Sequence, residues 1–143
     1  MIVVDCSIIS SYLLPDENDN YANQILDLVQ TGQENLIVPA IFASEVNNVA
    51  LMAYRRNRIS QEFLRKYINL VSKIPCEIDN YSASLTAISI ITEIAIKHNL
   101  TSYDATYLEV ALRQGARLAT LDKKLQSAAI SEGIFKNLDK VYM

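Results

Sequence analysis

The sequence predicts an α/β fold, a three-layer sandwich in which a short, mainly parallel sheet of four or five strands is flanked by helices. Short apolar runs alternate with amphipathic helical stretches along all 143 residues, an order that favours a parallel sheet covered on both faces. The run Ile2-Val3-Val4 is continuously apolar, as is typical of a strand buried on both faces. Half the residues are hydrophobic and no proline-, glycine- or serine-rich linker divides the chain, so we expect one domain over residues 1–143.

The expected elements follow from apolar periodicity and from helix stop signals. Strands are predicted at residues 2–4, 36–38 and 76–78, between Gly115 and Asp122, and at 133–138. Helices are predicted at residues 8–14, 21–30, 39–57, 60–73, 81–97, 101–114 and 123–129. Pro15, Gly32 and Gly115 end three of these helices, and Pro39 suits the first position of another.

The helix over residues 81–97 is expected to begin from Asp79 as its N-cap. Its inward-facing residues are predicted to be Leu85, Ile88, Ile91, Ile94 and Ala95. His98, the single histidine, lies at the C-terminus of this helix, where an imidazole suits the helix dipole, and we do not assign it to catalysis.

Composition limits the classes of partner and compartment. A formal charge of −3 and a pI near 5.1 give no global attraction to nucleic acid, so a polyanion would need a local binding device. Cys6 and Cys76 adjoin predicted strands and are expected in the core rather than in a disulfide, which favours a cytoplasmic protein. Asp5 interrupts the first apolar run, so we expect no signal peptide, and no uncharged stretch is long enough for a transmembrane helix.

Asp104 lies in the middle of an apolar helix face. At 100° per residue, that face also carries Tyr107, Leu108, Ala111 and Leu112. Burying an unpaired carboxylate costs several kcal/mol or more, so a cation, backbone donors or a metal ion should compensate it. Alternatively, Thr101-x-x-Asp104 forms a capping box and Asp104 only starts the helix.

Glu45 shows the same anomaly on the helix that follows the second strand. It lies on one stripe with Ile41, Phe42, Val49 and Met52. The structural alternative is an internal salt bridge, to Arg56 or to another helix.

Asp5 and Asp122 each stand where a predicted parallel strand ends, the edge at which open sheets of this class bind ligands. Each could instead be the N-cap of the next helix. Four converging carboxylates, with no histidine or thiolate grouped with them, suit Mg²⁺ or Mn²⁺. Such an ion would activate water for phosphodiester hydrolysis, and Ser7 and Thr120 could orient a carboxylate or water.

The middle of the chain is locally basic. Its cations are Arg55, Arg56, Arg58, Arg65 and Lys66. They form either an ordinary solvated helix face or an RNA-backbone contact.

These residues resemble the PIN domain, and most closely the VapC-type toxins of toxin–antitoxin pairs. The resemblance covers essentially the whole chain. Its most specific parts are Leu100-Thr101-Ser102-Tyr103-Asp104-Ala105 and Ala119-Thr120-Leu121-Asp122-Lys123-Lys124-Leu125. It implies a Mg²⁺- or Mn²⁺-dependent endoribonuclease that cuts structured RNA such as tRNA or rRNA, forms a homodimer and is neutralised by a small antitoxin.

By this resemblance, four acids carry the reaction and bind the metal: Asp5, Glu45, Asp104 and Asp122. Some relatives have a further acid just beyond the last aspartate, where this chain has Lys123 and Lys124, which weakens a two-metal assignment. Either lysine could bind RNA phosphate, as could Arg55 and Arg56.

Two other functions compete with this one. A receiver-like domain would use Asp79 as a phosphoacceptor, but would leave Glu45 and Asp104 pointing into the core without a purpose. A PIN-like scaffold would bind RNA or a partner protein without cutting.

Overall fold

Four short parallel strands form the sheet in the computed structural model, which describes residues 1–138. The strands are β1 (Ile2–Val4), β2 (Ile37–Pro39), β3 (Glu77–Asp79) and β4 (Arg117–Ala119). β1 pairs with β4, β2 pairs with β3, and a single parallel bridge between Ile2 and Leu36 joins the two pairs. Phe135 bridges Leu118 in the position of a fifth strand, so the order is β3-β2-β1-β4-Phe135.

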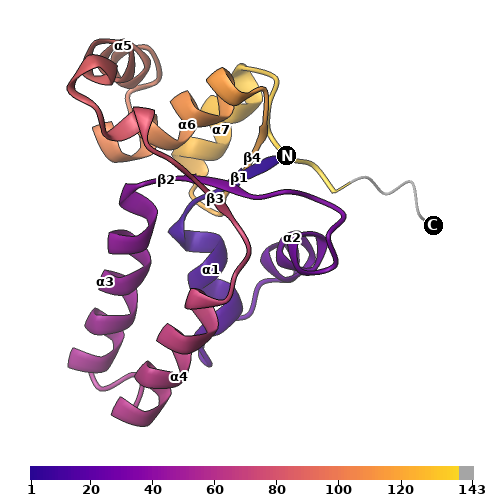
Figure 1. Cartoon of the computed structure of the whole chain (residues 1–143), viewed down its shortest axis with the longest axis vertical. Coiled ribbons are helices and arrows are strands. Elements are labelled where there is room, and N and C mark those ends of the chain that lie inside the picture. Colours follow the sequence, from indigo (N-terminus) through magenta and orange to yellow (C-terminus); the bar gives the residue numbers. More distant parts are fainter. Residues whose placement is uncertain (139–143) are drawn as a thin grey trace.

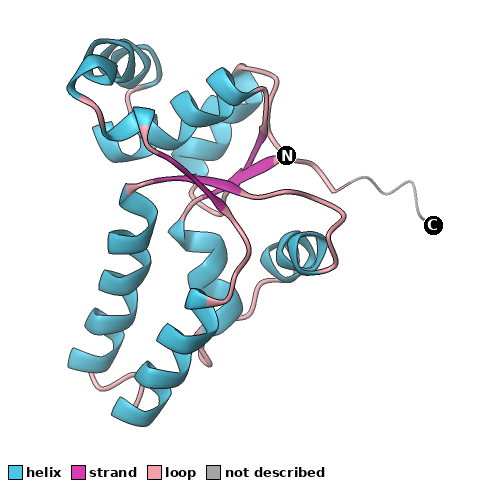
Figure 2. Ribbon diagram, viewed as in Figure 1, coloured by secondary structure: helices cyan, strands magenta, loops and turns pink. Residues whose placement is uncertain are grey.

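Helices cover both faces of this sheet. They are α1 (Cys6–Leu13), α2 (Asn20–Gln30), α3 (Ile41–Arg55), α4 (Gln61–Ser72), α5 (Ile88–His98), α6 (Ser102–Gln114) and α7 (Lys123–Ser131). In Figure 1 the strands cross the middle of the molecule, with α1 to α4 below them and α5 to α7 above. Figure 2 shows the same three layers with the strands in magenta. The predicted α/β sandwich is confirmed.

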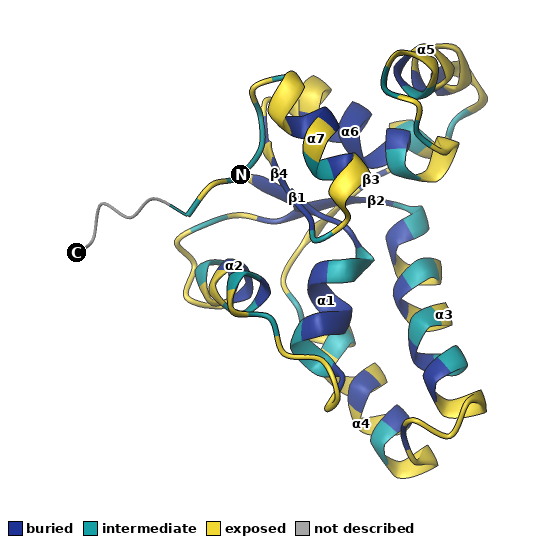
Figure 3. Ribbon diagram, turned by 180° about the vertical axis from the view of Figure 1, so that it is seen from behind, coloured by how far each residue is buried: buried dark blue, intermediate teal, exposed yellow. Residues whose placement is uncertain are grey.

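Helix α6 is the centre of the upper layer. Every residue from Ala105 to Ala111 is buried, because this helix packs against the sheet on one side and against α5 and α7 on the others. Figure 3 shows the buried surfaces of α6 and α1 facing the strands from opposite sides. Within residues 1–138, no helix combines the length and the apolar character needed to cross a membrane.

Two predicted boundaries near strand ends are wrong. Pro39 is the last residue of β2, opposite Asp79, and not the first position of a helix, because pairing with β3 keeps the chain extended up to that residue. The helix then starts at Ile41. Similarly, α1 begins at Cys6 rather than at residue 8, because Asp5 caps it directly after β1.

The region before α5 departs most from expectation. Residues 81–87 form two 3₁₀ turns, Tyr81–Ala83 and Leu85–Ala87, and the α-helix starts only at Ile88. Leu85 and Ile88, predicted to face inward, are 85% and 57% exposed, because α5 packs on α6 mainly through Ile91 and Ile94.

Two further residues predicted to be buried are exposed. Leu112 is 37% exposed near the end of α6, where it lines a hollow together with Ile90 and Ile94 of α5. Cys76 is also exposed, in the loop before β3. Cys6 is half-buried and both thiols are free.

Candidate metal centre

The four predicted acids come from four elements that meet at the carboxyl edge of the sheet. Asp5 directly follows β1, and Asp122 lies three residues beyond the end of β4. Glu45 is in the second turn of α3, and Asp104 is in the first turn of α6. Asp5 is buried, Glu45 and Asp104 are half-buried, and Asp122 is exposed.

Two hydroxyl groups hold the Asp5 carboxylate. Ser7 Oγ donates a hydrogen bond to Asp5 Oδ1, and Thr120 Oγ1 donates one to Asp5 Oδ2 at 2.7 Å. The same hydroxyl oxygens accept hydrogen bonds from the backbone N–H groups of Leu121 and Asp122, each at 3.0 Å. Ser7 and Thr120 therefore fix the orientation of one carboxylate and tie the ends of β1 and β4 together.

The capping roles suggested by the sequence are present alongside this arrangement. Asp5 accepts a hydrogen bond from Ser7 N–H at 3.2 Å, and Asp122 accepts one from Leu125 N–H at 2.9 Å. Thr101 Oγ1 accepts a hydrogen bond from Asp104 N–H at 3.1 Å, so Thr101 caps α6. Within residues 1–138 the reciprocal capping-box bond from Thr101 N–H to the Asp104 carboxylate is not formed, which leaves that carboxylate available.

Glu45 is oriented by a residue whose role the sequence did not reveal. The hydroxyl of Tyr107, a side chain only 1% exposed, donates a hydrogen bond to Glu45 Oε1 at 2.6 Å. Arg56 makes no ion pair with Glu45, nor does any other cation in residues 1–138. Tyr107 and Asp104 are three residues apart on α6, a spacing that puts both on one helix face and was the available signal.

Burial and the charges of neighbouring carboxylates raise the pKa values of two of the four acids, Asp5 and Asp104. Burial, together with the Asp104 charge, raises the pKa of Asp5 to about 6, against the lowering effect of the Ser7 and Thr120 hydrogen bonds. Burial and the charges of Asp122 and Glu45 raise the pKa of Asp104.

The same carboxylate charges act on the thiol of Cys6, the first residue of α1. Burial, and then the charges of Asp5, Glu45 and Asp104, raise the pKa of its thiol to about 12. The thiol therefore stays protonated and is a poor metal ligand.

These residues fit a hard divalent cation. In residues 1–138 no lysine, arginine or histidine forms an ion pair with any of the four acids, and Lys124 only partly offsets the raised pKa of Asp104. No three His, Cys, Asp or Glu side chains in that part of the chain are grouped tightly enough to hold an ion by themselves. Mg²⁺ keeps several water ligands and is commonly bound through one or two carboxylates, so this looser set suits it and does not suit zinc.

The predicted RNA-contacting residues lie in two places. Lys123 and Lys124 begin α7 next to Asp122 and line a polar hollow of about 510 Å³ together with Lys97, His98 and Asn99. Arg55 and Arg56 lie at the other end of α3, where both are exposed. The structure thus brings the lysines, but not the arginines, to the acids.

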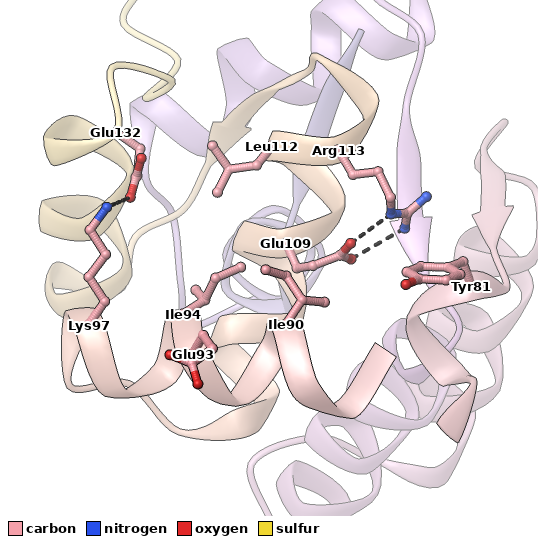
Figure 4. A pocket seen from close by; sticks show the side chains of 9 residues that line it. All are labelled: Tyr81, Ile90, Glu93, Ile94, Lys97, Glu109, Leu112, Arg113 and Glu132. Carbon is pink, nitrogen blue, oxygen red and sulfur yellow. Dashed lines mark hydrogen bonds and ion pairs between the residues drawn. The ribbon is translucent and has the colours of Figure 1, made fainter. Parts of the chain in front are cut away.

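The structure contains a second group of buried acids that the sequence did not predict. Asp79 and Glu109, 5% and 3% exposed, both bind Arg113, at 2.8 and 2.6 Å. Figure 4 shows the Glu109–Arg113 pair, with the guanidinium above the Tyr81 ring at 4.5 Å. Burial raises the pKa of Asp79, but its hydrogen bonds, including those from Arg113 and Gln114, outweigh burial, so the net shift is downward. Asp79 also bonds Ser82 in the first 3₁₀ turn and does not cap the later α5.

Comparison with known proteins agrees with this architecture. The sequence matches the PIN domain family over residues 2–131. The chain is similar to PAE2754 from Pyrobaculum aerophilum (TM-score 0.60, 23% identity, 89% of this chain and 78% of that one). It is also similar to FitAcB from Neisseria gonorrhoeae (TM-score 0.63, 18% identity, 91% and 94%). No curated protein matches the sequence. The receiver-like alternative is therefore wrong, and the chain belongs to the PIN domain family.

Proposed function

We propose that this protein is a Mg²⁺- or Mn²⁺-dependent endoribonuclease, the toxin of a type II toxin–antitoxin pair. PIN domains are generally metal-dependent nucleases. The observation that carries the proposal is the group of four carboxylates, Asp5, Glu45, Asp104 and Asp122. Burial and the charges of neighbouring carboxylates raise the pKa values of Asp5 and Asp104, and none of the four acids has an ion-pair partner in residues 1–138. Such a group is unfavourable by itself and favourable around a dication.

The chain's own residues would orient the reacting groups. Ser7 and Thr120 hold Asp5, and Tyr107 holds Glu45, so two carboxylates are fixed before a ligand arrives. A bound metal ion would polarise the phosphodiester and lower the pKa of a water molecule. No histidine lies among the acids, so proton transfer would fall to a carboxylate or to solvent.

RNA would be held next to the acids by Lys123 and Lys124. Their hollow is polar and lies at the start of α7, where local cations can attract phosphate although the chain is acidic overall. Arg55 and Arg56 are ten or more residues beyond Glu45 along α3, about 15 Å of helix, so they would meet only a longer RNA.

The VapC-type resemblance supplies the partners we propose. They are a small antitoxin protein that covers the carboxylates, and a second copy of the chain in a homodimer. The proposed compartment is the cytoplasm, where structured RNAs such as tRNA and rRNA are found.

Incubation with total RNA tests this function directly. We expect fragments in Mg²⁺ or Mn²⁺, none with EDTA, and none with Asp5→Asn under any condition. Asp27→Asn, an exposed aspartate on α2, is the matched control and should cut like the parent. Absence of parental cleavage in both metals, or equal cleavage by Asp5→Asn, would overturn the proposal.

A PIN-like scaffold that binds RNA without cutting is the second candidate. It is favoured by the absence, in residues 1–138, of three acids tight enough to hold an ion unaided. A filter-binding assay with labelled RNA distinguishes the nuclease from the scaffold. A scaffold would retain the RNA on the filter, and the RNA recovered after incubation with Mn²⁺ would still be full length.

A further inference from the structure

The hollow between the end of α5 and the start of α7, called the α5–α7 hollow below, is lined by cations. Its polar lining consists of Lys97, His98, Asn99, Lys123, Lys124 and Ser127, and no carboxylate of residues 1–138 lines it. Three other hollows in this part of the chain each include a glutamate or an aspartate, and the hollow between α3 and α4 has no charged residue. In a chain whose net charge is −3, this local excess of cations favours an anionic ligand.

Glu132 joins the two helices that form the α5–α7 hollow. Its Oε1 accepts a hydrogen bond from Lys97 Nζ at 2.8 Å and lies 2.8 Å from His98 Nε2. Figure 4 shows the Lys97–Glu132 pair between α5 and α7. The side chain of His98 is only 9% exposed, so its contact with Glu132 is shielded from solvent. One carboxylate offsets only one of the three lysine charges, and the hollow keeps an excess of positive charge.

Several other polar side chains of the hollow have no partner in the described part of the chain. There, the ammonium groups of Lys123 and Lys124 form no ion pair, and the side chains of Asn99 and Ser127 form no hydrogen bond. Asn99 ends α5 in the left-handed conformation, at φ 52°, which asparagine adopts more readily than most residues. Ammonium, amide and hydroxyl donors together match the oxygens of a phosphate group.

The α5–α7 hollow adjoins the candidate metal centre. Lys123 directly follows Asp122, and the charge of Lys124 partly offsets the raised pKa of Asp104. Lys124 therefore acts on the acids while it also lines the hollow. The hollow encloses about 510 Å³, many times the roughly 30 Å³ that one water molecule occupies, so a phosphate and part of its nucleotide can enter it.

We propose that the α5–α7 hollow is a second phosphate site, in which Lys97, Lys124 and Asn99 bind a backbone phosphate of the RNA strand whose scissile phosphodiester lies at the acids. The inference rests on the proposed function and adds Lys97 and Asn99 to the residues that hold RNA. A nucleic-acid strand suits this pair of adjacent sites, because its phosphates repeat along the chain: one can meet a metal ion at the acids while another meets the lysines. The RNA must then extend beyond the scissile bond on one side.

Fluorescence anisotropy of a labelled oligouridylate with the full chain, in EDTA so that the RNA stays intact, tests this site. For Lys97→Ala we expect a dissociation constant raised at least about threefold at low salt, and a plot of log affinity against log salt that is flatter by about 0.7, the value for one single-strand phosphate contact. The double variant Lys97→Ala, Lys124→Ala should flatten it by about 1.4, and Lys97→Arg should keep the parental slope. Lys73→Ala, an exposed lysine at the end of α4 that does not line the hollow, is the matched control and should bind like the parent. Since the Lys97 side chain is 65% exposed, its variants should keep the parental circular dichroism spectrum.

The second phosphate site would be refuted by a parent that does not bind the oligouridylate, by Lys97 variants that keep the parental slope and affinity, or by an equal effect of Lys73→Ala. Displacement of the RNA by a poly-glutamate peptide at the same concentration of charge would refute it too, because the ligand of the hollow would then be an acidic peptide. Cleavage plays no part in this measurement. A chain that binds RNA through the hollow but cuts none would refute the proposed function alone, and a chain that cuts RNA while Lys97→Ala keeps the parental slope would refute the hollow alone.

Discussion

Two groups of buried or half-buried acids lie in this molecule, and they differ in one respect. Asp79 and Glu109 both form ion pairs with the guanidinium of Arg113, which stacks over the Tyr81 ring. The group around Asp5 at the carboxyl edge of the sheet has hydroxyl donors and no ion-pair partner within residues 1–138.

The pKa values register this difference. Hydrogen bonds from Arg113 and its neighbours outweigh burial at Asp79 and hold its pKa down, whereas burial and Asp104 hold the pKa of Asp5 up. Acids paired inside the chain depend on their cation, because removing it would leave buried charges uncompensated, whereas acids without an internal cation are candidates for binding a ligand. A cluster of acids alone is therefore weak evidence for a metal centre, and the missing internal cation is what makes the group around Asp5 the candidate.

Removing the internal cation should cause the largest loss of stability. Arg113→Met would leave Asp79 and Glu109 buried and unpaired, and we expect a loss of about 2 to 3 kcal/mol in the free energy of unfolding, moderated because Arg113 is 32% exposed. Urea denaturation at neutral pH measures it. The control is Arg58→Met, which removes an exposed ion pair with Asp16 and should change little. Equal effects of the two variants would remove the distinction between the two groups of acids.

Neutralising Asp5 should act in the opposite direction. Its pKa is about 6 in the folded protein, against 3.8 for an unperturbed aspartate, so the folded state binds the proton more tightly than the unfolded chain. Deprotonation therefore destabilises the fold progressively between pH 4 and pH 6, and fully above pH 6. In metal-free buffer we expect Asp5→Asn to be more stable than the parent by about 3 kcal/mol at pH 7, and by only about 0.5 kcal/mol near pH 4.

The same urea titration, repeated at both pH values, checks this sign. A variant less stable than the parent at pH 7 would mean that the hydrogen bonds from Ser7 and Thr120 outweigh the desolvation of the charge.

Mg²⁺ should have the next largest effect, and it should act on the group of acids around Asp5. A ligand of the folded state at ten times its dissociation constant adds about 1.4 kcal/mol, so Mg²⁺ should raise the melting temperature of the parent. Asp104→Asn should be as stable as the parent or more stable without metal, since like charges are relieved, and should respond less to Mg²⁺. Differential scanning fluorimetry with Mg²⁺ and EDTA measures both. An equal Mg²⁺ response in the two proteins would place the ion elsewhere.

The fold could be predicted from the sequence because its signals are local. Three-residue apolar runs, glycine stops and the Asp5 and Asp122 caps fix most elements without long-range information. The prediction for Pro39 is wrong because pairing with β3, a tertiary contact, overrides its helix preference. The predictions for Leu85 and Ile88 are wrong because periodicity identifies apolar positions but not which of them the tertiary fold covers.

The same limit applies to the candidate site: residues with a local sequence signal could be predicted, and residues defined by long-range contacts could not. Two acids, Glu45 and Asp104, could be identified because they interrupt apolar helix faces. The Asp79–Arg113 pair could not, because a partner 34 residues away on another element leaves no local pattern. Tyr107 has the pattern of an ordinary core aromatic: its spacing from Asp104 places it on the same helix face but does not reveal that its hydroxyl reaches Glu45.

That hydroxyl gives the smallest and most specific test. Tyr107→Phe keeps the packing of a fully buried ring and removes the donor to Glu45 Oε1, so about 1 kcal/mol of stability should be lost. Tyr67→Phe is the matched control: it is also 1% exposed, and its hydroxyl has no hydrogen-bond partner by geometry within residues 1–138. If Tyr107 positions Glu45, its variant should cut RNA more slowly at saturating Mg²⁺ while Tyr67→Phe cuts at the parental rate. Parental cleavage by Tyr107→Phe, despite lower stability, would limit this tyrosine to packing and show that Glu45 needs no donor to act.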